Sequence, residues 1–316
     1  RQGRDSLSGI LPSSHESAVM PDTSYPGNRL YLNNLEGRDT NNGRSWASPI
    51  KTMGEALRRA TRGSVIYFYG KLREQDLVTP SGLTDVTILG CGTKVRGGHT
   101  GNTPGPKGGS ANWARTDRDS LVPLLRVTQQ GWRFVNLQLQ GPFAGPSILL
   151  TRNLAGESDD PNGWSAGYTE FNNCVFVGPN QFGICSEGGV NHVKVKDCWF
   201  YNFYERLGAE SETPPLNVAI GQVVGEGVGY PIMWEVLNNT FMASPKALHV
   251  SLADSVIRGN IFRDRAFVNP PARWDGPVVN FFDGGHNLVA DNFFDCARAD
   301  SAPFLKPGVG DTWGPN

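Results

Sequence analysis

VKDCWF, residues Val195–Phe200, is one of six hexapeptides in this chain that share a single pattern. The pattern reads apolar, any residue, Asn/Asp/Gly, a variable small or polar residue, any residue, and large apolar. Asn, Asp and Gly tolerate left-handed or bent backbone, so the third position predicts a corner. The apolar first and last positions predict the inward residues of two short strands that meet there. The six hexapeptides are Phe134–Leu139, Phe171–Phe176, Val195–Phe200, Val236–Phe241, Ile257–Phe262 and Val289–Phe294.

The fourth position of the pattern predicts a ladder of side chains stacked along the molecule. An earlier segment, Ile88–Cys91, enters the same pattern with its corner at Gly90. In coils stacked about 4.8 Å apart, asparagines at one position can hydrogen-bond in a row. We expect the ladder to lie inside the molecule and to determine the fold, without a catalytic role. Its cysteine and asparagine members are Cys91, Cys174, Cys198, Asn239, Asn260 and Asn292.

The spacing of the corners separates the repeat architectures. Successive corners from Gly90 to Asp291 lie 46, 37, 24, 41, 21 and 32 residues apart. Helical-pair repeats have nearly fixed lengths and propeller blades need four strands each, so neither fits. A coil of a parallel β-helix needs about twenty residues, and any of its turns can carry an insertion. The sequence therefore predicts an all-β parallel β-helix solenoid of about eight coils, with a β-sandwich as the alternative.

Composition and charge limit the partners of the chain. The 316 residues include 29 basic and 30 acidic side chains, so there is no overall field to attract nucleic acid. The chain has no run of eighteen apolar residues, so we expect no membrane insertion. We expect a polar N-terminal arm or linker over residues 1–28, a β-helix domain with long loop insertions over 29–300, and a C-terminal tail over 301–316.

The segment before the first coil predicts a capping helix. Thr52 and Glu55 form a Thr-x-x-Glu capping box, and Gly63 ends the short helix that follows. We expect this helix to cover the open end of the core and to block edge-to-edge pairing.

This entry block resembles that of the right-handed parallel β-helix, pectate-lyase-like superfamily. That superfamily includes polysaccharide lyases, glycosidases, epimerases and the tailspikes of bacteriophages, and the chain is closest in character to tailspikes and other virion-associated members. The resemblance implies a homotrimer on the virion surface, with the arm docked to other virion proteins; a secreted, extracellular protein is the alternative. It rests on Tyr31, Gly37, Asp39, Asn41, Gly43, Pro49, Lys51, Thr52, Ala56, Leu57, Gly63, Ile66 and Gly70.

Catalysis on a polysaccharide would need specific side chains in the loops. A glycosidase needs two carboxylates across the scissile bond, and the candidates that we name are Glu187, Asp283, Glu157 and Asp159. A lyase would need a basic residue; Lys194 and Lys196 alternate on one strand and should point outward beside Asp197. No spacing selects one set, so the catalytic residues stay unknown.

Metal and cysteine patterns are weak. Asp39-x-Asn41-x-Gly43 looks like the start of a calcium loop but lacks the distal Glu, so a tight turn is favoured and calcium is the only cofactor considered. The five cysteines lack zinc-type CxxC spacing. A disulfide between Cys174 and Cys198 and two buried thiols both fit adjacent coils. His192, Asp254 and His286 each precede a corner by five residues and predict a row of equivalent turn positions.

Three tryptophans, Trp113, Trp164 and Trp274, lie among Gly, Pro and Asn in swollen loops. Aromatic faces stack on sugar rings and also anchor protein interfaces. We therefore take them as candidate contacts to a glycan or a partner.

Two function classes follow from these patterns. The first is a virion-associated structural or adhesion protein, such as a tailspike, fibre or capsid decoration, that binds host-surface polysaccharide. The alternative is a polysaccharide lyase or glycosidase with its site in the outer loops. The absent catalytic signature favours the first, and a secreted surface β-helix that only adheres also fits.

Overall fold

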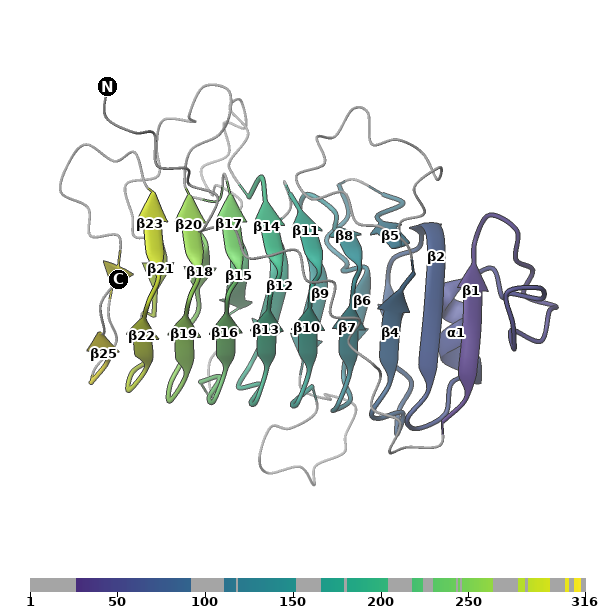
Figure 1. Cartoon of the computed structure of the whole chain (residues 1–316), viewed down its shortest axis with the longest axis horizontal. Helices are drawn as coiled ribbons and strands as arrows, with labels where there is room; N and C mark the ends of the chain where they lie inside the picture. Colours follow the sequence, from purple (N-terminus) through teal and green to yellow (C-terminus); the bar gives the residue numbers. More distant parts are fainter. Residues whose placement is uncertain are drawn as a thin grey trace, which may run out of the picture.

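The computed structural model describes residues 27–91, 111–117, 119–151, 166–178, 181–203, 218–223, 230–242, 244, 246–263, 278–281, 284–295, 305–306 and 310–313. Short parallel strands stack along one axis and form a right-handed parallel β-helix (Figure 1). A full coil contributes one strand to each of three sheets, here named A, B and C. The predicted fold class is therefore confirmed.

Each sheet is a stack of short strands. Sheet A contains β1 (Arg29–Asn33), the first half of β2 (Val65–Arg73), β4 (Thr87–Gly90), β7 (Arg133–Val135), β10 (Glu170–Asn172), β13 (Lys194–Lys196), β16 (Glu235–Leu237), β19 (Val256–Arg258), β22 (Leu288–Ala290) and β25 (Thr312–Trp313). Sheet B contains the second half of β2, β5 (Ala111–Ala114), β8 (Gln138–Gln140), β11 (Val175–Val177), β14 (Trp199–Tyr201), β17 (Thr240–Met242), β20 (Ile261–Arg263) and β23 (Phe293–Asp295). Sheet C contains β3 (Leu77–Val78), β6 (Leu125–Val127), β9 (Pro146–Thr151), β12 (Phe182–Glu187), β15 (Val218–Val223), β18 (Leu248–His249), β21 (Val279–Asn280) and β24 (Leu305–Lys306). These eight strands agree with the predicted number of coils.

The C-terminal boundary of the β-helix differs from the prediction. β24 and β25 lie in the segment 301–316, expected to be a separate tail, and they pair in parallel with β21 and β22. The described part of that segment therefore continues the solenoid. The arm predicted over residues 1–28 lies almost wholly outside the described residues.

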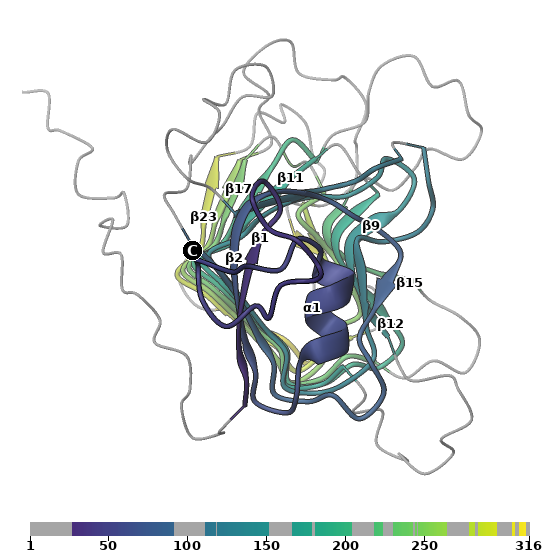
Figure 2. The ribbon, with the colours of Figure 1, turned by 90° about the vertical axis from the view of Figure 1, so that its right-hand side faces the viewer.

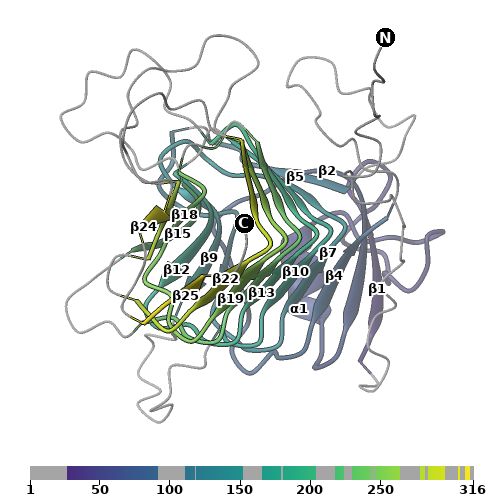
Figure 3. The same cartoon turned by 60° about the vertical axis from the view of Figure 1, so that its left-hand side comes forward.

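The six hexapeptides stack in the predicted register. Phe171 pairs with Phe134 and Val195, and Phe200 pairs with Phe176 and Phe241. All six corner residues are left-handed, with φ between 53° and 68°, and they turn the chain from sheet A into sheet B (Figure 3). Five phenylalanines of the sixth position form a stack with ring centroids 4.8–4.9 Å apart: Phe176, Phe200, Phe241, Phe262 and Phe294.

The fourth position forms the predicted ladder inside the molecule. Asn260 Nδ2 donates to Asn292 Oδ1 at 3.0 Å, and Asn260 Oδ1 accepts from Asn239 N at 2.9 Å. Earlier in the chain a thiol takes the place of the amide, because Cys198 Sγ accepts from Cys174 N at 3.4 Å. Both cysteines are buried free thiols. Of the two expectations for this pair, a disulfide and two buried thiols, the structure has the second.

Cys91 departs from the rest of the ladder. Its thiol is half-buried, and burial raises the pKa of Cys91 to about 11. Gly90 before it is not among the left-handed corners. Glycine is needed there for another reason, because a Cβ would lie 2.0 Å from the carbonyl oxygen of Asn136.

A second row of left-handed residues turns the chain from sheet C into sheet A. The predicted equivalence of His192, Asp254 and His286 is confirmed by the register of the strands that follow them. The hexapeptide pattern did not reveal a second buried ladder beside this row, in which Ser255 N donates to Asn287 Oδ1 at 3.0 Å. The left-handed members of the row are Asp85, Gly131, Tyr168, His192, Met233, Asp254, His286 and Gly310.

Helix α1 (Met53–Arg59) covers the N-terminal end of the core, as predicted (Figure 2). Thr52 Oγ1 accepts from Glu55 N at 3.2 Å, which forms one half of the capping box. The other half is absent, because the Glu55 carboxylate pairs with Arg59 at 2.5 Å. Glu74 accepts from the first two helical N–H groups instead, at 2.6 and 3.2 Å. Among the described residues no helix is long and apolar enough to cross a membrane.

Candidate functional site

The outer face of sheet A presents a regular grid of side chains. Along each strand, alternate residues enter the core, and those between them point outward. Five successive coils therefore each present three outward positions. In chain order these are Tyr168, Glu170 and Asn172; His192, Lys194 and Lys196; Met233, Glu235 and Leu237; Asp254, Val256 and Arg258; His286, Leu288 and Ala290. Asn172 is buried, and the other residues are at least partly exposed.

Charges alternate along the middle of this grid. Lys194 lies in register between Glu170 and Glu235, and its Nζ is 3.1 Å from Glu235 Oε2. Lys196 Nζ is 3.8 Å from Asp197 Oδ2, so both lysines lie on the outer face as predicted. All of these side chains are partly exposed, so each pair contributes little to stability. They offer a ligand a row of hydrogen-bond donors and acceptors.

The second left-handed row borders the grid. The rings of Tyr168 and His192 stack with centroids 4.6 Å apart and planes within 4°. Tyr168 is 45% exposed, and Met233 on the next coil is 47% exposed. In the coil before Tyr168 the matching position is Gly131, which has no side chain. The row thus presents an aromatic surface at the edge of a polar grid.

Tyr168 and Met233 occupy backbone that does not suit them. Their φ angles are 55° and 56°, a region that Asn, Asp and Gly enter most readily. A bulky residue held there costs on the order of 1–3 kcal/mol. Sequence reasoning missed both residues, although each precedes its corner by the same five residues as His192. The offset of five residues before a corner would have indicated both Tyr168 and Met233, but in the sequence it was considered only for histidine and aspartate.

Of the predicted catalytic residues the structure describes only Glu187, which does not lie on this face. Glu187 ends β12 in sheet C, on another side of the solenoid (Figure 2), and its Oε2 is 3.0 Å from Arg126 Nη1. Both side chains are partly exposed. The other named carboxylates, Asp283, Glu157 and Asp159, lie outside the described residues.

The prediction that Trp113 contacts a glycan is wrong. Trp113 belongs to β5, is fully buried, and pairs in register with Leu72 and Leu139. Its indole Nε1 donates to the carbonyl of Glu74 at 2.8 Å. Strand alternation directs the ring into the core, where no ligand can stack on it. Trp164 and Trp274 lie outside the described residues.

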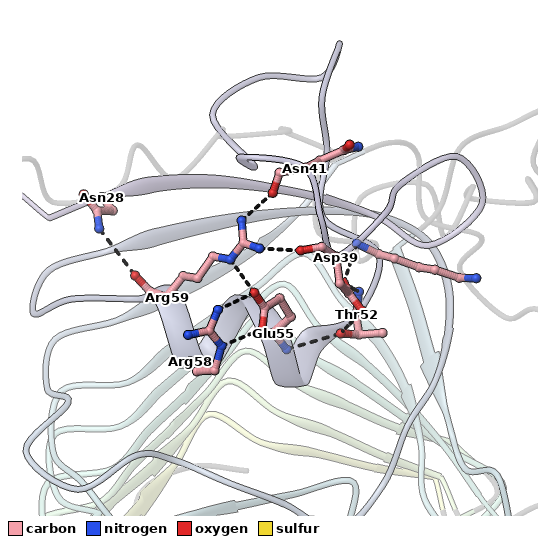
Figure 4. A network of polar contacts seen from close by, with 8 residues as sticks. Asn28, Asp39, Asn41, Thr52, Glu55, Arg58 and Arg59 are labelled. Carbon is pink, nitrogen blue, oxygen red and sulfur yellow. Dashed lines mark hydrogen bonds and ion pairs between the residues drawn. The ribbon is translucent and has the colours of Figure 1, made fainter.

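Asp39 and Asn41 form a tight turn, which is the interpretation that the sequence favoured over a calcium loop. Asp39 Oδ1 accepts from Thr52 N at 2.9 Å, and its Oδ2 accepts from Thr52 Oγ1 at 3.0 Å (Figure 4). Asn41 Nδ2 donates to Pro49 O at 2.8 Å. Both carboxylate oxygens therefore hold the chain before α1. Among the described residues no three His, Cys, Asp or Glu side chains are grouped to hold a metal ion.

Comparison with known proteins finds only distant structural likenesses. No family model and no curated protein matches the chain. Among solved structures, a rhamnogalacturonan lyase is similar over 90% of this chain and 66% of its own, at 14% identity and a TM-score of 0.47. A pectin methylesterase from carrot is similar over 92% and 90%, at 12% identity and a TM-score of 0.45. A GH136 lacto-N-biosidase from Eubacterium ramulus is similar over 91% and 67%, at 12% identity and a TM-score of 0.38.

The three structures are an esterase, a lyase and a glycosidase by name. The expected closeness to bacteriophage tailspikes finds no counterpart among them.

Proposed function

We propose that this chain binds an extended polysaccharide on the outer face of sheet A. One observation carries the proposal: Tyr168 is exposed and stacked on His192 in a left-handed position that the fold alone would fill with Asn, Asp or Gly. An aromatic ring in such a place offers a flat apolar surface to the ring of a sugar. The Tyr168 side chain is therefore better suited to contact with a ligand than to left-handed backbone.

The charged grid complements the aromatic surface. Glu170, Lys194 and Glu235 lie on three successive coils about 4.8 Å apart, and all three are partly exposed. A polymer lying along the axis meets a new set of donors and acceptors at each coil. Several weak contacts on one rigid face then act together, which raises the apparent affinity.

Hydrolysis of the bound chain is the second candidate function. Glu170 and Glu235 are two coils apart, so their Cα atoms are separated by about 10 Å. Inverting glycosidases hold their two carboxyl groups roughly 6.5–9.5 Å apart, with a water between them. Both residues lie on the outer face of sheet A with Lys194 between them, whereas Glu187 ends β12 in sheet C.

Binding is tested by affinity electrophoresis in gels that contain acidic or neutral polysaccharides. Tyr168→Asn removes the ring and keeps a residue suited to left-handed backbone, so the variant should fold. We expect its retardation to fall about tenfold, equivalent to about 1.4 kcal/mol. Phe293→Ala is the matched control, because Phe293 is 55% exposed but belongs to β23 in sheet B. Equal retardation of wild type and Tyr168→Asn would refute the proposal.

Hydrolysis is tested by release of reducing ends from the polysaccharides that bind. If Glu170 and Glu235 act as a pair, Glu170→Gln and Glu235→Gln should each abolish release while binding persists. Wild-type protein that binds without releasing any reducing ends would show that the hydrolytic candidate is wrong.

The setting of this function stays a prediction. We propose the virion surface, a homotrimer, and docking of the arm over residues 1–28 to other virion proteins, with a secreted protein as the alternative. Light scattering that finds only monomers in solution would count against the trimer.

A further inference from the structure

A cluster of four aromatic side chains lies at the N-terminal end of sheet A, away from the Tyr168 row. Tyr31 and Tyr67 stack with ring centroids 5.0 Å apart and an angle of 18°. Trp46 meets Tyr31 edge-on at 5.1 Å and Tyr69 edge-on at 6.4 Å. Tyr31, Trp46, Tyr67 and Tyr69 are here named the aromatic patch.

Strand geometry places the patch on the outer face. Tyr31 of β1 and Tyr67 of β2 are register partners, and Tyr69 follows two residues later on the same side. Their neighbours Leu30, Ile66 and Phe68 alternate with them and are buried in the core. The three tyrosines are half-buried, and Trp46 is 43% exposed.

The loop that carries Trp46 is tied to the fold on both sides. Tyr31 N donates to Gly43 O at 2.8 Å, and Gly43 N donates to Ser48 O at 3.0 Å, which closes the turn around Trp46. Arg59 of α1 donates to the carbonyl oxygens of Asp39 and Asn41 in the same loop (Figure 4). The Trp46 ring is thus held in place before a ligand arrives, which lowers the entropic cost of binding.

The size and chemistry of the patch point to a sugar. A stable protein interface uses about 20–30 residues on each side, whereas the patch consists of four rings. Its ring faces are apolar, and three phenol hydroxyl groups supply donors and acceptors beside them. A pyranose has the matching surfaces, with C–H groups on its faces and hydroxyl groups around its edge.

We propose that the aromatic patch is a second sugar-binding subsite, selective for neutral pyranose rings, on the same face as Tyr168. This rests on the proposed function, because one polysaccharide would occupy both places. Tyr67 and Tyr168 are three coils apart along the axis and four residues apart across the sheet, so the two subsites are separated by on the order of 20 Å. A chain of several sugar rings bridges that distance.

The test uses native gels cast with xyloglucan, galactomannan or arabinoxylan, all of them neutral. We expect Trp46→Leu to lose about tenfold in affinity, or about 1.4 kcal/mol, and Trp46→Phe to keep most of it. Trp46→Leu keeps apolar bulk without an aromatic face, so the pair of variants separates stacking from simple apolar contact. Melting curves show whether each variant is folded.

The Tyr168→Asn variant, run in the same gels, separates the two subsites. Weakening of Trp46→Leu with Tyr168→Asn unchanged supports the aromatic patch and overturns the proposed role of Tyr168. Weakening of Tyr168→Asn with Trp46→Leu unchanged overturns the patch. Wild-type protein that migrates freely through every neutral gel also overturns the patch, and retention in acidic gels alone would leave the Tyr168 site standing.

Discussion

Removal of one amide from the asparagine ladder should cost a large share of the stability of the fold. The side chain of Asn260 is fully buried and makes four hydrogen bonds. Its Oδ1 accepts from the backbone N and from the Nδ2 of Asn239, at 2.9 and 3.0 Å. Its Nδ2 donates to Val236 O at 2.8 Å and to Asn292 Oδ1 at 3.0 Å.

Alanine at this position does not affect all four partners equally. Asn239 Nδ2 keeps Val195 O at 2.9 Å, and Asn292 Oδ1 keeps Asn260 N at 3.0 Å. The backbone N of Asn239 loses its acceptor, and a buried group left without a partner costs about 1–3 kcal/mol. Val236 O, Asn239 Nδ2 and Asn292 Oδ1 each lose one of their hydrogen bonds, worth about 0.5–1.5 kcal/mol apiece. We expect Asn260→Ala to destabilise by about 4 kcal/mol, of the roughly 5–15 kcal/mol that holds a typical domain together.

The chain supplies its own control in the cysteines of the same ladder. Cys198 Sγ accepts from Cys174 N at 3.4 Å, and its single S–H group lies 3.2 Å from Lys196 O and 3.5 Å from Phe171 O. A thiol therefore keeps the acceptor role of the amide at longer range, with one donor in place of two. Asn260→Cys should therefore cost about half as much as Asn260→Ala, roughly 2 kcal/mol. Guanidinium unfolding followed by circular dichroism measures both. Equal losses for the two variants, or a loss below about 1 kcal/mol for alanine, would refute the reasoning.

Three further predictions concern backbone strain, protonation and thiol reactivity. Met233→Asn should stabilise the protein by about 0.5–1 kcal/mol in guanidinium unfolding, because asparagine suits the left-handed φ of 56°; a loss of stability would contradict this. Burial raises the pKa of Glu74 above its ordinary 4.5, so the folded chain keeps a proton that the unfolded chain releases, and stability should fall as pH rises from 4.5 through the raised value. Glu74→Gln should flatten that slope in urea unfolding, and an unchanged slope would exclude Glu74 as its source. Because the pKa of Cys91 is about 11, iodoacetamide should label Cys91 slowly at pH 8 and faster with each rise in pH. Cys174 and Cys198 are buried and should react only on unfolding. Peptide mass mapping measures the labelling, and rapid labelling of Cys91 at pH 8 would contradict the raised pKa.

The fold was predictable because its corners demand particular residues. A left-handed corner next to two apolar strands leaves a chemical trace in Asn173, Asp197 and Asn238, whatever the length of the loops between them. Trp113 was misplaced because a four-residue strand that directly follows a glycine-rich segment carries no comparable trace. Only the pairing of β5 with β2 and β8 shows that Ala111–Ala114 belongs to sheet B.

The candidate site was less predictable because stacking, not local sequence, creates it. Glu170, Lys194 and Glu235 are separated by 24 and 41 residues and become neighbours only through the register of their strands. Tyr31 and Tyr67 likewise come together only when β1 pairs with β2. The sequence indicated that the coils stack, but the insertions hid which exposed residues face one another across the coils.

The two left-handed rows have the same backbone conformation but carry different side chains. In the first row the left-handed corners from Asn136 to Asp291 are all Asn, Asp or Gly, which adopt this backbone at the lowest cost. In the second row Tyr168 and Met233 take the same backbone, and both are nearly half exposed, so burial offsets only part of the strain. Strain of this kind persists where a side chain serves something other than the fold. A ligand is therefore to be sought at the second row and not at the ladder. Tyr168→Asn separates the two roles, because one substitution relieves the backbone and removes the aromatic surface.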